Sequence, residues 1–203
     1  MKGNAGQYNF SNKIYMFFCL IRTKLFYPKA RLIRFPFDIR NGKQIQWDEN
    51  FTTGRLCRIE VINDKDSDKS QKKIFIGKNV RMGDFIHISA YDSIKIGNNV
   101  GIGPKTVITD VSHGNFAENE IYDLDIEYAE RPLMGKSVEI GNNVWIGESV
   151  SILPGVTIGD GCIIGAMTNV VRSIPPYSIA VGNPAKVVKK YNFETRCWER
   201  VKK

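Results

Sequence analysis

Residues 140–174 read IGNNVWIGESVSILPGVTIGDGCIIGAMTNVVRSI, and an aliphatic side chain returns at every sixth position. Four residues after each comes another apolar or small one. A helix repeats at about 3.6 residues and a plain strand at about two, so neither gives this spacing. A short fixed period predicts a solenoid, and a period of six predicts a parallel β-helix. The two series are Ile140, Ile146, Ile152, Ile158, Ile164, Val170 and Val144, Val150, Val156, Cys162, Thr168, Ile174.

The spacing also predicts which side chains point into the coil and which point out of it. In Val144-Trp145-Ile146 the outer two residues point to one face of a strand, into the coil, and Trp145 points out. Trp145 and Ile163 are 18 residues apart, which is one coil of three units, so we expect them to stack. An exposed apolar stripe of this kind indicates an interface or a ligand groove. Gly, Asn and Asp fill the corners between strands, where they suit φ > 0.

The pattern continues upstream from Ile76, less regularly, and fails between Ser112 and Ile140. We therefore predict a parallel β-helix over residues 46–183, with an extended polar loop near 114–138. Loops this long inside a repeat array are usually functional or disordered. Residues 1–45 form an N-terminal cap, helical or irregular, and residues 184–203 form a basic C-terminal helix or tail.

Apolar residues 14–21 are too few to span a bilayer, which needs about 20. We expect them to pack on the end of the coil, with contact to a membrane surface as the alternative. The four Cys have no metal or disulfide spacing, which fits a reducing cytoplasm. The net charge of +8 favours an anionic partner, and without a nucleic-acid motif a phosphorylated small molecule fits better than nucleic acid.

The chain contains only two histidines, His87 and His113. His113 follows the inward Ser112, so it points outward where the repeat stops and the loop begins. An outward imidazole beside a long loop is well placed for proton transfer. His87 also points outward, but inside a continuing array, and is interpreted as a surface or interface residue. Two histidines do not supply the three zinc ligands of a carbonic-anhydrase site, and we predict no metal.

Residues 96–189 closely resemble the hexapeptide-repeat acyltransferases, in particular the maltose/galactoside acetyltransferase-like branch that includes surface-polysaccharide O-acetyltransferases. The motifs that carry the resemblance are ITDVSHG (108–114), IGNNVWIG (140–147), ILPGVTIG (152–159) and VGNPAKV (181–187). The resemblance implies a left-handed coil, a homotrimer, and acetyl-CoA bound between neighbouring subunits. It implies His113 as the general base that deprotonates the acceptor. A carboxylate often orients this base, and Glu130 aligns best, with Asp110 and Glu127 as the other candidates.

The same resemblance implies a set of residues that contact the cofactor. Gly165 and Ala166 match the turn that touches pantetheine, where a small residue permits close approach. The other matched positions near coenzyme A are Trp145, Gly147, Arg172 and Lys186. Arg172 stands where the family usually has Lys, which keeps the charge. Val171 replaces the usual Thr or Ser before it, at a cost of roughly 1 kcal/mol for one polar contact.

The leading hypothesis is an acetyl-CoA-dependent O-acetyltransferase that acts on a sugar hydroxyl in lipopolysaccharide or capsule synthesis. An N-acetyltransferase of a nucleotide-linked amino sugar would use the same base and cleft. Residues 1–70 contain no Gly-rich strand–turn–helix, which disfavours the versions with a separate nucleotide-sugar domain. An antibiotic acetyltransferase is a third alternative. A non-catalytic β-helix scaffold is the rival of a different class.

Overall fold

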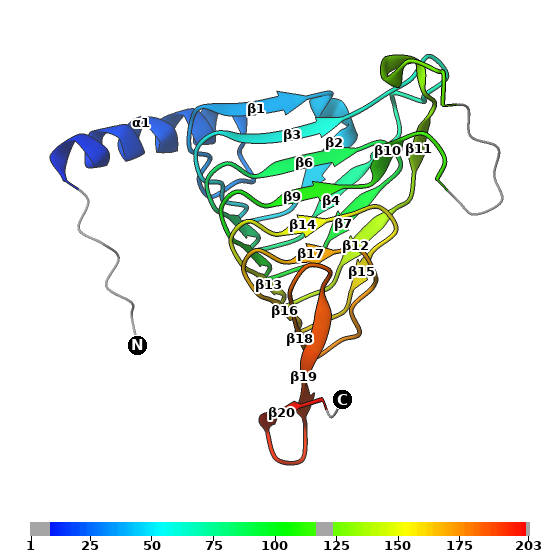
Figure 1. Ribbon diagram of the computed structural model, residues 1–203. Coiled ribbons are helices and arrows are strands. Elements are labelled where there is room, and N and C mark those ends of the chain that lie inside the picture. The colour runs from blue at the N-terminus through cyan, green and yellow to red at the C-terminus, as the bar shows by residue number, and fades with distance from the viewer. Residues whose placement is uncertain (1–8, 117–123, 202–203) are drawn as a thin grey trace.

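The computed structural model describes residues 9–116 and 124–201, and short strands wound into a coil dominate it (Figure 1). Three sheets form the faces of this coil. Sheet 1 contains β1 (Phe37–Arg40), β3 (Cys57–Val61), β6 (His87–Ala90), β9 (Val107–Thr109), β14 (Ser151–Ile152) and β17 (Asn169–Val170). Sheet 2 contains β2 (Ile45–Trp47), β4 (Ile74–Ile76), β7 (Ile94–Ile96), β12 (Val138–Ile140) and β15 (Thr157–Ile158).

Sheet 3 contains β5 (Arg81–Met82), β8 (Gly101–Ile102), β13 (Trp145–Ile146), β16 (Ile163–Ile164), β18 (Ser178–Val181), β19 (Lys186–Asn192) and β20 (Cys197–Arg200). The chain visits sheets 2, 3 and 1 in turn, and within these sheets each strand before β19 pairs in parallel with its equivalent one coil away. The predicted parallel β-helix is therefore confirmed. We name its three edges by the sheets they join: the 2–3, 3–1 and 1–2 edges.

The interior of the coil is the hydrophobic core. Every residue predicted to point inward between 140 and 174 is buried, including Cys162 and Thr168. Like residues stack from coil to coil, as Ile96, Ile140 and Ile158 do in sheet 2. Each fully buried aliphatic side chain contributes about 1.5–3 kcal/mol, so the stack of coils supplies its own core. Burial also raises the pKa of the Cys162 thiol, which agrees with a packing role.

The third residue of each predicted corner has a left-handed backbone. Asn143, Ser149 and Met167 have φ between 56° and 57°, and Gly155 and Gly161 have φ of 80° and 65°. At the 2–3 edge these residues are asparagines in four successive coils before Gly161, and their side-chain amides form a ladder. The bonds run from Asn50 Nδ2 to Asn79 Oδ1 (3.0 Å), from Asn79 Nδ2 to Asn99 Oδ1 (2.9 Å) and from Asn99 Nδ2 to Asn143 Oδ1 (3.1 Å).

Where the first residue of a corner is glycine, the reason differs from the expected φ > 0. Gly97 and Gly141 do not have left-handed φ. A Cβ on Gly97 would lie 2.7 Å from the carbonyl carbon and oxygen of Gly141 in the next coil, and one on Gly141 would lie 2.8 Å from the Asp160 nitrogen. Successive coils approach so closely at this position that a side chain does not fit between their backbones.

Helix α1 (Phe10–Phe26) precedes the coil. The side chain of Asn9 caps it, because its Oδ1 accepts a hydrogen bond from the backbone N–H of Asn12 at 2.9 Å. A helix is thus present in the N-terminal segment. Its packing is the reverse of the expected one, because the apolar side chains Ile14, Phe17 and Phe18 are exposed. The parallel strands also begin before residue 46, since β1 pairs with β3 from Phe37 onward.

The C-terminal helix predicted over residues 184–203 is wrong, because β19 and β20 form an antiparallel hairpin that extends sheet 3 (Figure 1). The side chains alternate along β19, with Val187, Lys189 and Tyr191 more buried than the residues between them. Tyr191 pairs with Trp198 across the hairpin, with ring centroids 5.3 Å apart. β-branched and aromatic residues in this alternation favour a strand over a helix.

Candidate active site

The break in the repeat after Ser112 is an antiparallel hairpin at the 1–2 edge. Its arms are β10 (Val111–His113) and β11 (Leu133–Gly135), and His113 lies opposite Leu133. A short 3₁₀-helix, η2 (Tyr128–Glu130), lies between the arms along the chain. The hairpin leaves the stack of coils on the side where β9 ends and β12 begins (Figure 1). The predicted loop is therefore an ordered projection at both of its ends.

Asp110 fixes the base of this hairpin. Its carboxylate is buried and accepts hydrogen bonds from the backbone N–H groups of Tyr91 (2.6 Å) and Asp92 (2.9 Å). Its carbonyl oxygen accepts a further bond from the Lys136 N–H at 2.8 Å. Burial raises the pKa of this carboxyl group. Asp110 thus ties the hairpin to the neighbouring coil, and its described contacts do not include His113.

The His113 ring is half-buried and stacks on Tyr128, with centroids 4.6 Å apart and planes tilted by 44°. The Tyr128 hydroxyl lies 3.5 Å from His113 Nε2. Nδ1 of His113 is buried and has no hydrogen-bond partner among the described residues. Among the described residues, Tyr128, which the sequence did not single out, therefore holds the imidazole. The hexapeptide period could not reveal it, because Tyr128 lies where that period is absent.

The two glutamates proposed to orient His113 do not contact it among the described residues. Glu130 ends η2 and Glu127 precedes it, and both side chains are exposed. Neither makes a hydrogen bond to His113 among the described residues. A small hollow of about 180 Å³ opens at the hairpin base, lined in part by Ser112, Phe116 and Pro154. His113, next to Ser112 on the strand, does not line it.

Most of the predicted cofactor residues gather at sheet 3 and the 3–1 edge. Trp145 in β13 is 62% exposed and pairs with Ile163, so the expected outward stack is present. Gly147 begins the next corner, and a Cβ on it would lie 2.6 Å from the Ala166 nitrogen. Gly165 and Ala166 form the equivalent corner one coil on, and Ala166 is exposed. These residues line one edge with small side chains.

Lys186 belongs with this group, and Arg172 does not. Lys186 begins β19 and pairs with Val181 at the end of β18, in sheet 3, with its side chain exposed. Arg172 follows β17 in sheet 1 and precedes Ile174, which bridges to Ile158 of sheet 2. Arg172 is therefore at the 1–2 edge, as is His113. Within one chain, the full width of sheet 1 separates these two residues from Ala166.

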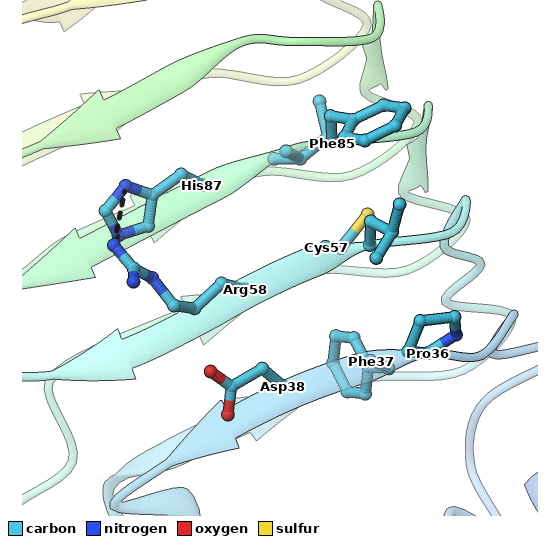
Figure 2. Close-up of a pocket in the computed structure, with 9 residues that line it drawn as sticks. Pro36, Phe37, Asp38, Cys57, Arg58, Phe85 and His87 are labelled. Atoms are coloured by element: carbon cyan, nitrogen blue, oxygen red, sulfur yellow. Dashed lines mark hydrogen bonds between the residues drawn. The ribbon is translucent and has the colours of Figure 1, made fainter.

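A second pocket, of about 480 Å³, lies on the outer face of sheet 1 across β1, β3 and β6 (Figure 2). Phe37 and Phe85 border it on one side, and Asp38, Arg58 and His87 on the other. His87 Nε2 lies 2.8 Å from Glu60 Oε1 and 2.9 Å from Arg58 Nη2. His87 is thus outward, as predicted, and held in a network of charged groups on the coil surface.

The chain resembles proteins of one family. Residues 137–172 match the model of the bacterial transferase hexapeptide, six repeats. WbbJ of Escherichia coli K12, assigned to lipopolysaccharide biosynthesis as an O-acetyl transferase, is 38% identical over 182 residues, covering 89% of each chain. The chain belongs to the hexapeptide-repeat acetyltransferases. Rv3034c of Mycobacterium tuberculosis, assigned as an acetyltransferase, is 35% identical over 157 residues, which are 74% of this chain and 49% of the relative.

Solved structures agree on the fold of this acetyltransferase. One is of a variant of AntD, an N-acyltransferase from Bacillus cereus, bound to dTDP-4-amino-4,6-dideoxyglucose and coenzyme A. Its TM-score is 0.57 at 22% identity, over 82% of this chain and 84% of AntD. A galactoside acetyltransferase in complex with coenzyme A has a TM-score of 0.52 at 24% identity, over 80% and 76% of the two chains. Membership of this family implies the left-handed sense of the coil.

Proposed function

We propose that this acetyltransferase transfers an acetyl group from acetyl-CoA to a sugar hydroxyl in bacterial surface-polysaccharide synthesis. The relative WbbJ, similar over 89% of both chains, supports this acceptor class and the O-acetyl product. The observation that carries the chemistry is the state of His113. Its ring is held against Tyr128 at the break in the repeat, with one nitrogen buried and without a described partner.

In the proposed reaction, His113 accepts the proton of the acceptor hydroxyl as the oxygen attacks the thioester carbonyl. The C–S bond then breaks, an ester forms, and the proton passes from His113 to the departing thiolate. General base catalysis contributes typically about 10²–10⁴-fold to the rate. The remainder comes from holding donor and acceptor together. Tyr128 fixes the ring plane, and a ring so held presents its nitrogen to the acceptor in one orientation.

We further propose that the complete site forms between two copies of the chain, in a trimer. His113 and Arg172 lie at the 1–2 edge, whereas Trp145, Ala166 and Lys186 lie on the other side of sheet 1. A copy that brings its 1–2 edge against the 3–1 edge of a neighbour would unite the two groups. The exposed Trp145 supports this arrangement, because it would be covered by the cofactor and the neighbour.

The test measures release of free coenzyme A from acetyl-CoA in the presence of sugar, lipid-linked sugar and nucleotide-linked amino-sugar acceptors. His113→Ala should lower kcat by about 10²–10⁴-fold while leaving acetyl-CoA affinity unchanged. His87→Ala is the matched comparison, since these are the only two histidines, and it should keep kcat within a small factor. Loss of activity in His87→Ala with full activity in His113→Ala would reject the assigned base.

The acceptor screen separates the alternatives. Transfer to amino sugars alone would replace O-acetylation by N-acetylation, with the same base. A scaffold without catalysis would show no transfer to any acceptor and no thermal stabilisation by acetyl-CoA. A cofactor present at 100 times its Kd should instead stabilise the protein by about 2.7 kcal/mol.

A further inference from the structure

Helix α1 presents an apolar stripe to the outside of the molecule. Phe10, Phe17 and Leu25 are 78%, 60% and 71% exposed. At 3.6 residues per turn these side chains fall on one face of the helix, together with others that are also exposed. The complete stripe is Phe10, Ile14, Phe17, Phe18, Ile21 and Leu25. A contiguous apolar surface of this kind marks a contact with another apolar phase or molecule.

The opposite face of α1 is fixed to the rest of the chain. The Tyr15 hydroxyl donates to the Phe35 carbonyl oxygen at 2.7 Å. The buried Thr23 hydroxyl donates to the Cys19 carbonyl oxygen at 2.7 Å and accepts from the Ile33 N–H at 2.8 Å. The Arg22 guanidinium lies 4.0 Å from the centre of the Phe35 ring. These contacts fix the roll of the helix, so its apolar stripe cannot turn inward without breaking them.

The charge of this region is of one sign. The first 37 residues contain seven Lys and Arg and no Asp or Glu. Of the net charge of +8, +7 therefore comes from this segment and +1 from the remaining 166 residues. Lys13, Arg22 and Lys24 lie on α1 itself, and Lys29 and Arg31 follow it directly. Such a segment attracts a surface that carries negative charge.

We propose that α1 docks this acetyltransferase on an anionic phospholipid bilayer, lying in the plane of the membrane surface with its apolar stripe in the acyl boundary. An apolar face flanked by Lys and Arg is the pattern of an interfacial helix. In the described chain, no helix is long and apolar enough to cross a bilayer. The helix points away from the coil (Figure 1), which leaves the stripe free to approach a flat surface. A second copy is disfavoured as the occupant, because two such segments repel each other.

The experiment measures sedimentation of the full-length protein with vesicles of phosphatidylcholine alone or mixed equally with phosphatidylglycerol. We expect binding to the mixed vesicles only, weakened by sodium chloride. Lys13→Gln with Lys29→Gln should lower the partition coefficient roughly 30-fold, at about fivefold for each basic residue. Lys65→Gln with Lys69→Gln, two exposed lysines on the distant 62–73 loop, is the matched control and should bind as wild type.

Phe17→Gln with Leu25→Gln should lower binding by roughly 100-fold or more, since each side chain would lose its burial in the acyl region. Gln is a good helix former, and an unchanged Tm would show that the helix persists. Wild-type protein that fails to bind mixed vesicles would overturn the proposal. The proposal would also be overturned if the Phe17→Gln, Leu25→Gln variant lost an assembly that the wild type forms in lipid-free buffer. The apolar stripe of α1 would then be an interface between copies of the chain.

Discussion

Replacing Gly97 by alanine tests whether close approach of the coils, and not backbone conformation, requires the corner glycines. A Cβ on Gly97 would lie 2.7 Å from the Gly141 carbonyl, whereas ordinary contact begins at 3.4 Å, so the two coils must separate locally by about 0.7 Å. The hydrogen bond from the Gly97 N–H to the Ile140 carbonyl oxygen, now 2.7 Å, would lengthen by a similar amount. Bonds beyond about 3.2 Å are weak. Overpacking of this kind costs about 1–3 kcal/mol.

Gly101→Ala is the matched control, because it is the same substitution one strand further along the same coil. Its Cβ would meet nothing closer than Trp145 Cδ1 at 3.8 Å, and its φ is not left-handed. Restricting the unfolded chain should then stabilise the protein by about 0.4–1 kcal/mol. For a chain of this size 1 kcal/mol corresponds to about 2–4 °C in Tm. We expect Gly97→Ala to melt roughly 2–12 °C lower and Gly101→Ala roughly 1–4 °C higher.

The stability of both variants and the wild type is measured by thermal and urea unfolding, with tryptophan fluorescence as the signal and one fixed protein concentration. Equal concentrations matter because the proposed trimer would make the apparent stability depend on protein concentration. A Gly97→Ala variant as stable as Gly101→Ala would refute the reasoning, since the clash would then be relieved without cost.

Three further predictions concern single side chains. Asp110→Asn should change the pH dependence of stability, because burial raises the pKa of the Asp110 carboxyl group in the folded protein. The wild type should therefore lose stability relative to the variant as the pH rises from about 3.9, the pKa in the unfolded chain, towards the raised folded pKa. Urea unfolding at several pH values measures this difference. Thr23→Val should lower the free energy of unfolding by about 1–3 kcal/mol, because the Ile33 N–H loses its acceptor. Thr23→Ser keeps the hydroxyl and should retain most of that free energy in the same denaturation assay. Trp145→Ala should raise the KM for acetyl-CoA about tenfold, consistent with roughly 1.4 kcal/mol for an aromatic contact, with kcat little changed.

The six-residue period predicted which residues between 140 and 174 are buried, because each repeat makes the same contacts as the next. It also predicted the stacking of Trp145 on Ile163. The outward direction of His113 stays a prediction, because β10 lies in the hairpin and not in the coil from which that direction was reasoned. It could not predict Tyr128, whose contact with His113 depends on how the hairpin folds back.

Two errors have physical causes. The residues from Val187 to Trp198 carry apolar side chains compatible with either a helix or a strand, and the open edge of sheet 3 decides in favour of strands. The apolar residues of α1 were expected to pack inward because that is their usual role. The actual inner face uses Thr23 and Tyr15, whose hydrogen bonds to residues 33–35 come from a segment with no repeat to reveal it.

The hairpin of β10 and β11 joins the coil through one short closure, where Lys136 bonds to Asp110 and Asp110 bonds to the coil before it. The described residues beyond that closure are outside the ladder of parallel strands. Added chain length there costs little free energy, since doubling a flexible loop raises the free energy of loop closure by only about 0.6 kcal/mol. The segment between the two arms can therefore be lengthened while β9 and β12 keep their register, provided that Tyr128 keeps its contact with His113. One scaffold could in this way acquire new acceptors by changing a single appendage, without having to evolve a new core.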